Sequence, residues 1–239
     1  MGQQLYAARK EIWKPFDIAY QPIISISNGA IYGYEALFRP QNGTPEQIIE
    51  IAASKGKLVE LETQICEEAV NRFIRVETRL MLFLNLTPAS YSFANGRVIM
   101  ESLVGIPPER VVLEITECVN LPKDIRTITS RWRRFGYKLA VDDISKGYAR
   151  LTAIAELEPD FIKIDRECIA GALQSNSWLK VLEGVIYMAR NINAMTIGEG
   201  IEMESEKRLL EEFGVDFGQG YYFGKPEIWF PCKGDKGGG

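Results

Sequence analysis

Short apolar runs alternate along the chain with longer segments in which apolar residues recur every three to four positions. The apolar runs cover residues 16–26, 30–40, 80–87, 110–117, 138–143, 160–165, 194–200 and 216–224. Their length and composition are typical of buried strands. The amphipathic segments, which predict helices, cover residues 45–77, 91–104, 122–136, 147–158, 177–191 and 202–214. Glycine ends several of these helices, at Gly136 and Gly214 for example, as is common at helix C-termini.

The order of these elements predicts an α/β fold. The first two strands are joined by Ser27, Asn28 and Gly29, a tight hairpin signal, so we expect them to be antiparallel. The remaining strands alternate with helices, which favours a parallel sheet with right-handed crossovers. Eight strands in 239 residues fit a closed TIM-type (β/α)₈ barrel with one irregular strand. A doubly wound open sheet is the alternative. We expect one domain over residues 1–232 and a flexible tail over residues 233–239.

Composition and charge narrow the class of protein. The formal net charge of −4 provides no basic field, so we expect neither DNA nor an anionic membrane surface as a partner. The first residues, MGQQLYAARKEIW, carry charge where a secretion signal needs an apolar core, and no apolar run approaches membrane-spanning length. The four cysteines are scattered without a CxxC pair, which is typical of reduced thiols in the cytosol. These features predict a cytoplasmic protein.

The chain contains no histidine. Catalysis by a Ser-His or Cys-His pair is therefore excluded, as is a zinc site that needs imidazole. Any metal used for chemistry must take mostly oxygen ligands, which favours hard cations such as Mg²⁺ or Mn²⁺.

Polar residues stand late in seven of the apolar runs. They are Glu35, Asn85, Glu114, Asp142, Asp143, Lys163, Glu199 and Gln219. A barrel gathers its active-site residues at the carboxyl ends of its strands. A solvated strand end is the alternative for any single residue, but it explains the whole set poorly. Converging carboxylates would raise one another's pKa values, so the pattern predicts a bound divalent metal.

The run DFIKID places a lysine among these carboxylates. Phe161, Lys163 and Asp165 share one strand face, while Ile162 and Ile164 take the other. One interpretation is a structural salt bridge from the lysine to Asp165 or to a neighbouring carboxylate. The other is a cation that polarises a water or neutralises a phosphate. An acidic site with hard metals, one lysine and one arginine suits phosphate-ester hydrolysis. A magnesium-dependent barrel enzyme of the enolase type would use similar residues.

An ordered set of motifs makes phosphate-ester hydrolysis the better interpretation. The run AIYGYEALFRP contains the letters E-A-L with an arginine two residues further on. YQPI precedes it, and NLT, EITE, VDD with GY, DFIKID, GEGIE and GQGYYFGKP follow in order. From about Leu5 to Pro226 the chain resembles an EAL domain, the cyclic di-GMP phosphodiesterase family. The resemblance implies a modified TIM barrel with an antiparallel first strand, and an EAL domain over residues 1–232.

The resemblance also implies a metal site. Glu35, Asn85, Glu114 and Asp142 look like the ligands of a first ion, with Asp142 bridging to a second ion that Asp143 also binds. The ions would be Mg²⁺ or Mn²⁺, and two of them are expected. Ca²⁺ should support binding but inhibit turnover, because its larger radius and looser shell misplace the attacking water.

The remaining implied roles are catalysis and substrate binding. Lys163 would contact the attacking water, Glu199 would orient water or act as base, and Glu35 would serve in both the metal and the catalytic sets. The residues implied in binding the dinucleotide are Gln21, Leu37 through its backbone, Arg39 on a phosphate oxygen, Glu202 and Gln219. The implied reaction opens cyclic di-GMP to linear pGpG. The family usually pairs barrels through the helix expected at residues 147–158, so a homodimer is expected.

The loop after the paired aspartates departs from the family pattern. That pattern is approximately DDFGTGYSSL, and here it is DDISKGYARL. Ser145 stands where glycine is usual and would strain a backbone that needs a positive φ. Ile144 replaces an aromatic anchor, which favours a loosely packed loop. Glu117, which resembles the carboxylate that braces this loop, is present. The alternative function is therefore a catalytically weak EAL domain that serves as a cyclic di-GMP receptor or as a dimerising regulatory module.

Overall fold

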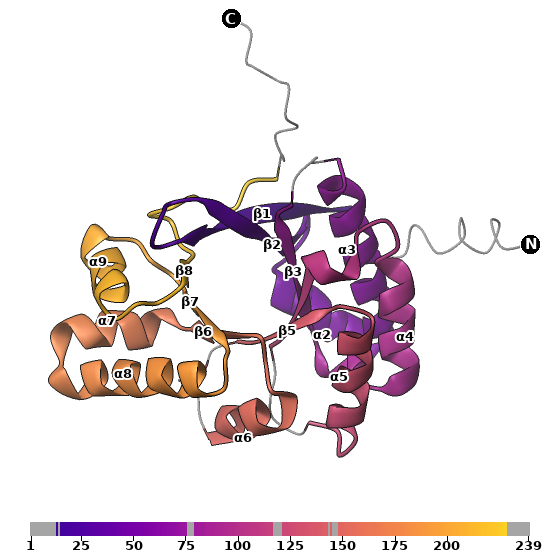
Figure 1. Cartoon of the computed structure of the whole chain (residues 1–239). Coiled ribbons are helices and arrows are strands. Elements are labelled where there is room, and N and C mark those ends of the chain that lie inside the picture. The colour runs from indigo at the N-terminus through magenta and orange to yellow at the C-terminus, as the bar shows by residue number, and fades with distance from the viewer. Residues whose placement is uncertain are drawn as a thin grey trace, which may run out of the picture.

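The computed structural model describes residues 13, 15–75, 79–116, 121–142, 144 and 148–228. Eight strands form a closed barrel in sequence order, surrounded by helices (Figure 1). The strands are β1 (Phe16–Ser25), β2 (Ile31–Pro40), β3 (Met81–Leu86), β4 (Val111–Ile115), β5 (Lys138–Val141), β6 (Phe161–Ile164), β7 (Met195–Gly198) and β8 (Phe217–Gly218). The predicted barrel is confirmed, and the open doubly wound sheet is excluded.

The first strand runs against both of its neighbours. β1 pairs antiparallel with β2 and with β8, while all other neighbouring strands pair in parallel. The turn between β1 and β2 contains Gly29 at φ 71°, and the Asn28 side chain accepts a hydrogen bond from the Ala30 amide at 2.9 Å. The hairpin signal in the sequence therefore identified the reversed strand correctly.

The helices differ from the sequence prediction in two places. They are α2 (Pro45–Ser54), α3 (Leu58–Phe73), α4 (Phe93–Ser102), α5 (Ile125–Arg134), α6 (Tyr148–Leu157), α7 (Arg166–Gln174), α8 (Asn176–Asn191) and α9 (Glu204–Glu212). The segment 45–77 forms two helices, because Gly56 takes φ 64° and interrupts the pattern. The sequence pattern did not predict α7, which begins after Asp165 and packs beside α8 (Figure 1).

Apolar side chains form two layers. The larger layer fills the space between the barrel and the helices, and it includes Ile162 and Ile164 on the outer face of β6. It also includes Ile144, which is 4% exposed. Residues 143 and 145–147 of the same loop lie outside the described residues, so the expected loose packing of the loop stays a prediction. The smaller layer fills the inside of the barrel and includes Phe161, as the predicted alternation of β6 requires.

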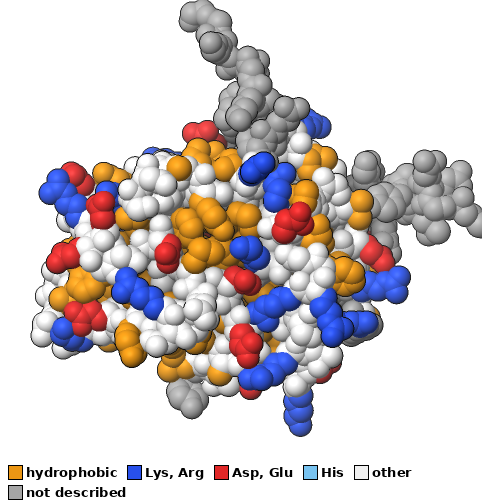
Figure 2. All heavy atoms as spheres, viewed as in Figure 1, with side chains coloured by type: hydrophobic (Ala, Val, Ile, Leu, Met, Phe, Trp, Pro, Cys, Tyr) orange, Lys and Arg blue, Asp and Glu red, His pale blue; other side chains and the backbone are white. Residues whose placement is uncertain are grey.

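The surface has no dominant charge on the face shown in Figure 2. Lysine, arginine and carboxylate side chains are interspersed there, and hydrophobic side chains gather near the centre, over the barrel. This mixture agrees with the small net charge of −4. Among the described helices, none has the length and apolar character needed to cross a membrane.

Candidate active site

The inner face of the barrel changes from apolar to polar over two residues along a strand. Phe83 belongs to the apolar layer, and Asn85 follows it on the same face of β3. On β4, Val112 belongs to that layer and Glu114 follows it in the same way. The parallel pairing of these strands aligns Asn85 with Glu114. The two-residue alternation of side chains and the parallel register together place these polar residues side by side at the carboxyl end of the barrel.

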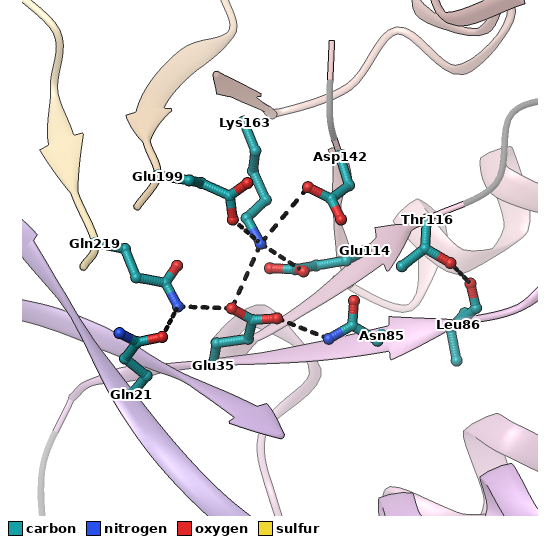
Figure 3. Close-up of polar contacts among 10 residues, drawn as sticks. All are labelled: Gln21, Glu35, Asn85, Leu86, Glu114, Thr116, Asp142, Lys163, Glu199 and Gln219. Carbon is teal, nitrogen blue, oxygen red and sulfur yellow. Dashed lines mark hydrogen bonds and ion pairs between the residues drawn. The ribbon is translucent and has the colours of Figure 1, made fainter. Parts of the chain in front are cut away.

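Lys163 lies at the centre of this polar layer (Figure 3). Its side chain is 1% exposed, and its ammonium nitrogen is 2.7 Å from Glu199 Oε1 and 2.8 Å from Glu114 Oε2. The same nitrogen is 3.5 Å from Glu35 Oε2 and 3.9 Å from Asp142 Oδ1. The interpretation of Lys163 as a salt-bridged residue is thus confirmed.

Asp165, the other partner considered for Lys163, has a structural position at the start of α7. Its carboxylate accepts a hydrogen bond from the Cys168 amide at 3.1 Å and so caps the helix. The sequence contained this signal, because an aspartate directly before the first residue of a helix is a common N-cap.

The Glu35 carboxylate contacts Lys163 and also accepts hydrogen bonds from amide side chains. Its Oε1 accepts a hydrogen bond from Asn85 Nδ2 at 2.7 Å, and its Oε2 accepts one from Gln219 Nε2 at 2.6 Å. Gln219 Nε2 also donates to Gln21 Oε1 at 3.1 Å. Gln21 lies opposite Glu35 in the antiparallel β1–β2 pair, so the reversed first strand is what brings it into the site (Figure 3).

Burial and charge shift the pKa values of these groups in different directions. Burial raises the pKa of Glu114 well above its usual range, and the neighbouring Glu35 adds to this effect. Burial likewise raises the pKa of Glu199 to about 8, against the lowering effect of Lys163. For Glu35 burial is again the largest effect, but Lys163, Asn85 and Gln219 together lower its pKa below the usual value. Burial opposes the charge of Lys163, yet the surrounding carboxylates hold its pKa well above the usual value.

The donor set fits a hard divalent cation. Four carboxylates, those of Glu35, Glu114, Asp142 and Glu199, surround one ammonium group, so the ionised site carries excess negative charge. Glu114 Oε1 is buried and accepts no hydrogen bond from the described residues, although a buried carboxylate oxygen normally requires a partner. Within the described ranges no three carboxylate or thiol side chains stand close enough together to hold a metal as placed. The Lys163 ammonium lies among the carboxylates (Figure 3).

A pocket of about 660 Å³ opens beside this cluster. Its lining includes Gln21, Glu35, Glu199, Glu202 and Gln219. The structure thus brings together three of the residues predicted to bind substrate with two of the predicted catalytic residues. Leu37 and Arg39 lie further along the inner face of β2 and are not among the residues that line the pocket. Asp143 and Glu117 lie outside the described residues, as do Ser145 and residues 229–239.

Arg166 and Tyr221 are among the pocket-lining residues that were not predicted from the sequence. Arg166 pairs with Glu202 through its two terminal guanidinium nitrogens, with Nη2 at 2.6 Å from Glu202 Oε2. Tyr221 lines the pocket and is 58% exposed. Arg166 directly follows the DFIKID run and Tyr221 stands two residues after Gln219, so both could have been found by extending the runs.

A modified TIM-type barrel with an acidic pocket at the carboxyl ends of its strands is the class that this fold and site define. The family model for the EAL domain matches residues 7–226, so the chain belongs to the EAL domain family. The family resemblance drawn from the sequence motifs is confirmed.

The relatives agree in fold and family. The probable cyclic di-GMP phosphodiesterase PdeB of Escherichia coli is 29% identical over 87% of this chain and 42% of its own length. The solved EAL enzyme Bd1971, in its form bound to cAMP and cyclic di-GMP, is 25% identical with a TM-score of 0.81, over 94% of this chain and 64% of that one. A manganese and cyclic di-GMP complex of Klebsiella pneumoniae BlrP1 is 24% identical with a TM-score of 0.81, over 91% of this chain and 57% of that one. The chain spans about a quarter to a half of the length of the curated relatives it matches.

Proposed function

We propose that this chain is a cyclic di-GMP phosphodiesterase that hydrolyses the cyclic dinucleotide to linear pGpG and depends on a divalent metal. The observation that supports this most directly is the excess of carboxylates around the buried Lys163, with Glu114 Oε1 left without a hydrogen bond from the described residues. An anionic substrate would be repelled by such a site unless cations were bound there. Membership of the EAL family and the activity named for PdeB support the same substrate.

The proposed metal ligands are the oxygen donors of the polar layer. Glu35, Asn85, Glu114 and Asp142 would hold a first Mg²⁺ or Mn²⁺, and Asp142 with Asp143 a second. When bound, these ions would lower the pKa of a water and neutralise phosphate charge. The Lys163 ammonium lies between the carboxylates in this structure and partly neutralises their negative charge. We propose that bound metal ions would neutralise part of that charge in its place.

Lys163 and Glu199 are the residues proposed to act on the attacking water. The Lys163 ammonium would hold the water oxygen in line with the scissile bond. Burial raises the pKa of Glu199 to about 8, which suits a carboxylate that accepts a proton near neutral pH. The water oxygen would bond to phosphorus as its proton passes to Glu199, and the P–O3′ bond would break as the leaving 3′-oxygen takes up a proton from Glu199 or from solvent. The products are a 5′-phosphate and a free 3′-hydroxyl.

The substrate would bind along the pocket and the end of β2. Gln21 and Gln219 line the pocket with Glu202, while the Leu37 backbone and Arg39 would contact the dinucleotide, Arg39 at a phosphate oxygen. Glu202 is paired with Arg166 in this structure. A guanine that formed hydrogen bonds with the Glu202 carboxylate would therefore share this carboxylate with Arg166 or displace Arg166 from it.

Product analysis tests the proposal. Purified protein at a concentration equal to that of cyclic di-GMP should form pGpG with Mn²⁺ or Mg²⁺, as measured by chromatography. With Ca²⁺ the same protein should bind the dinucleotide without forming product. No nucleotide binding with any of the three ions would refute the proposal.

A second function is favoured by the altered loop sequence DDISKGYARL. If Mn²⁺ supports binding but no pGpG forms, we propose instead that the chain is a cyclic di-GMP receptor or a dimerising regulatory module. In either case we propose a homodimer formed through α6, where Leu151 is 49% exposed. The scattered cysteines support a cytoplasmic location, and Cys66 and Cys168 are buried free thiols.

A further inference from the structure

The backbone that follows Asn85 is held from three directions. The Leu86 carbonyl accepts a hydrogen bond from the Tyr91 hydroxyl at 2.8 Å. It also accepts one from Thr116 Oγ1 at 3.1 Å (Figure 3). The Thr87 amide donates to Glu62 Oε1 at 2.6 Å. The single peptide unit that joins Leu86 to Thr87 is therefore held by side chains at both its carbonyl and its amide.

Among the residues that make these contacts, Glu62 is unusual because its carboxylate is buried. It lies on α3 and is 4% exposed, although burying a carboxylate is costly unless its oxygens are hydrogen-bonded. Both oxygens do have donors, because Oε2 also accepts a hydrogen bond from the Ser90 hydroxyl. Glu62 thus joins a helix outside the barrel to the segment that leaves β3, and both of its partners lie within five residues of Asn85.

We propose that Glu62 is a positioning residue for Asn85, and through it for the divalent cation of the proposed function, on which this inference rests. The Asn85 amide is the only uncharged side chain among the predicted metal ligands. A cation attracts it less strongly than it attracts a carboxylate, so its position depends more on the backbone that carries it. Its amide nitrogen donates a hydrogen bond to Glu35 at 2.7 Å. The amide oxygen is therefore the atom that can coordinate a cation. Glu62 fixes the strand end from which that oxygen is presented.

A purely structural role for Glu62 predicts a different result. If the residue only stabilised the packing of α3, its loss would lower the free energy of unfolding and leave metal affinity unchanged. Residues that orient metal ligands typically change metal affinity by about 10–100-fold when they are mutated. Metal affinity measured on folded protein therefore separates the two roles.

The test is titration calorimetry with Mn²⁺ on the parent chain and on three variants. Glu62→Ala should bind Mn²⁺ about 10–100-fold more weakly than the parent. Glu62→Gln should bind close to the parent affinity, since its amide oxygen can still accept from Thr87 and its amide nitrogen can donate to Ser90. Thr63→Val is the matched control, because the Thr63 hydroxyl is also largely buried on α3 but donates to the Val59 carbonyl at 2.6 Å. It should keep the parent affinity.

The outcomes distinguish this inference from the proposed function. A parent chain that binds no Mn²⁺ would refute both. A parent that binds Mn²⁺, with a folded Glu62→Ala variant of equal affinity, would overturn only the role of Glu62. A Glu62→Gln variant as weak as Glu62→Ala would also overturn it, because the hydrogen bonds would then not be the cause. If circular dichroism shows Glu62→Ala to be unfolded, Glu62→Met decides the question, since it fills similar volume without an acceptor.

Discussion

The two ends of the barrel interior are built from the same strands and have opposite chemistry. At one end, aromatic rings pack together, with Phe83 and Phe161 centroids 5.4 Å apart and Tyr32 stacked on Phe217 at 4.1 Å. At the other end, carboxylates surround the Lys163 ammonium. On β6 the two layers are separated by a single residue, because Phe161 and Lys163 share one face of the strand.

This contrast shows how one layer supports the other. The aromatic layer excludes water from below the site, and ionic interactions strengthen as the local dielectric falls. Burial is also the largest cause of the raised pKa values of Glu114 and Glu199. The apolar end therefore gives the polar end its unusual electrostatics, and changes at either end should have separable effects.

The largest expected effect is on stability, at the apolar end. Phe161→Ala should lower the free energy of unfolding by about 3–5 kcal/mol, because it opens a cavity under three other rings. Urea denaturation followed by circular dichroism measures this loss. A change within experimental error would show that the aromatic layer is not a packed core.

The next effect is on catalysis, at the polar end. Lys163→Ala should lower kcat by about 10²–10³-fold with KM nearly unchanged, because the ammonium is proposed to act on the water in the transition state. Lys138→Ala is the control, since Lys138 lies on the same barrel face at the apolar end, 5.7 Å from the Phe161 ring centroid. It should leave kcat unchanged. A rise in KM alone for Lys163→Ala would make the lysine a binding residue.

The smallest effect is the response of stability to metal and pH. Mn²⁺ at about 100 times its Kd should stabilise the fold by about 2.7 kcal/mol. Because burial raises the pKa values of Glu114 and Glu199, the metal-free fold binds more protons than the unfolded chain between about pH 4.5 and 8. Its stability should fall as the pH rises through this window. Metal replaces those protons, so the shift in Tm should be larger at pH 8 than at pH 6.

A matched pair of variants checks this response. Glu114→Gln should reduce the Mn²⁺-induced shift in Tm, while Glu211→Gln on the exposed face of α9 should not. Equal shifts in both variants would place the metal elsewhere on the protein.

Much of this architecture could be predicted from local sequence. The two-residue period of each strand put Asn85, Glu114 and Lys163 on inner faces, and the turn at Gly29 identified the reversed first strand. The helix break at Gly56 and the start of α7 were missed, because a single glycine and a single capping aspartate were outweighed by the longer apolar patterns around them.

The sequence by itself determined which residues face the barrel interior, because strand periodicity is a local property of the chain. Only the tertiary structure decided which of them meet. Glu114 and Lys163 are 49 residues apart in the chain, and Gln219 and Glu35 are 184 apart, yet both pairs form hydrogen bonds. The contact of Glu62 with Thr87 joins a helix to a strand end across 25 residues. Such contacts depend on barrel closure and strand register, which arise from the summed packing of distant segments and leave no trace in the spacing of any one motif.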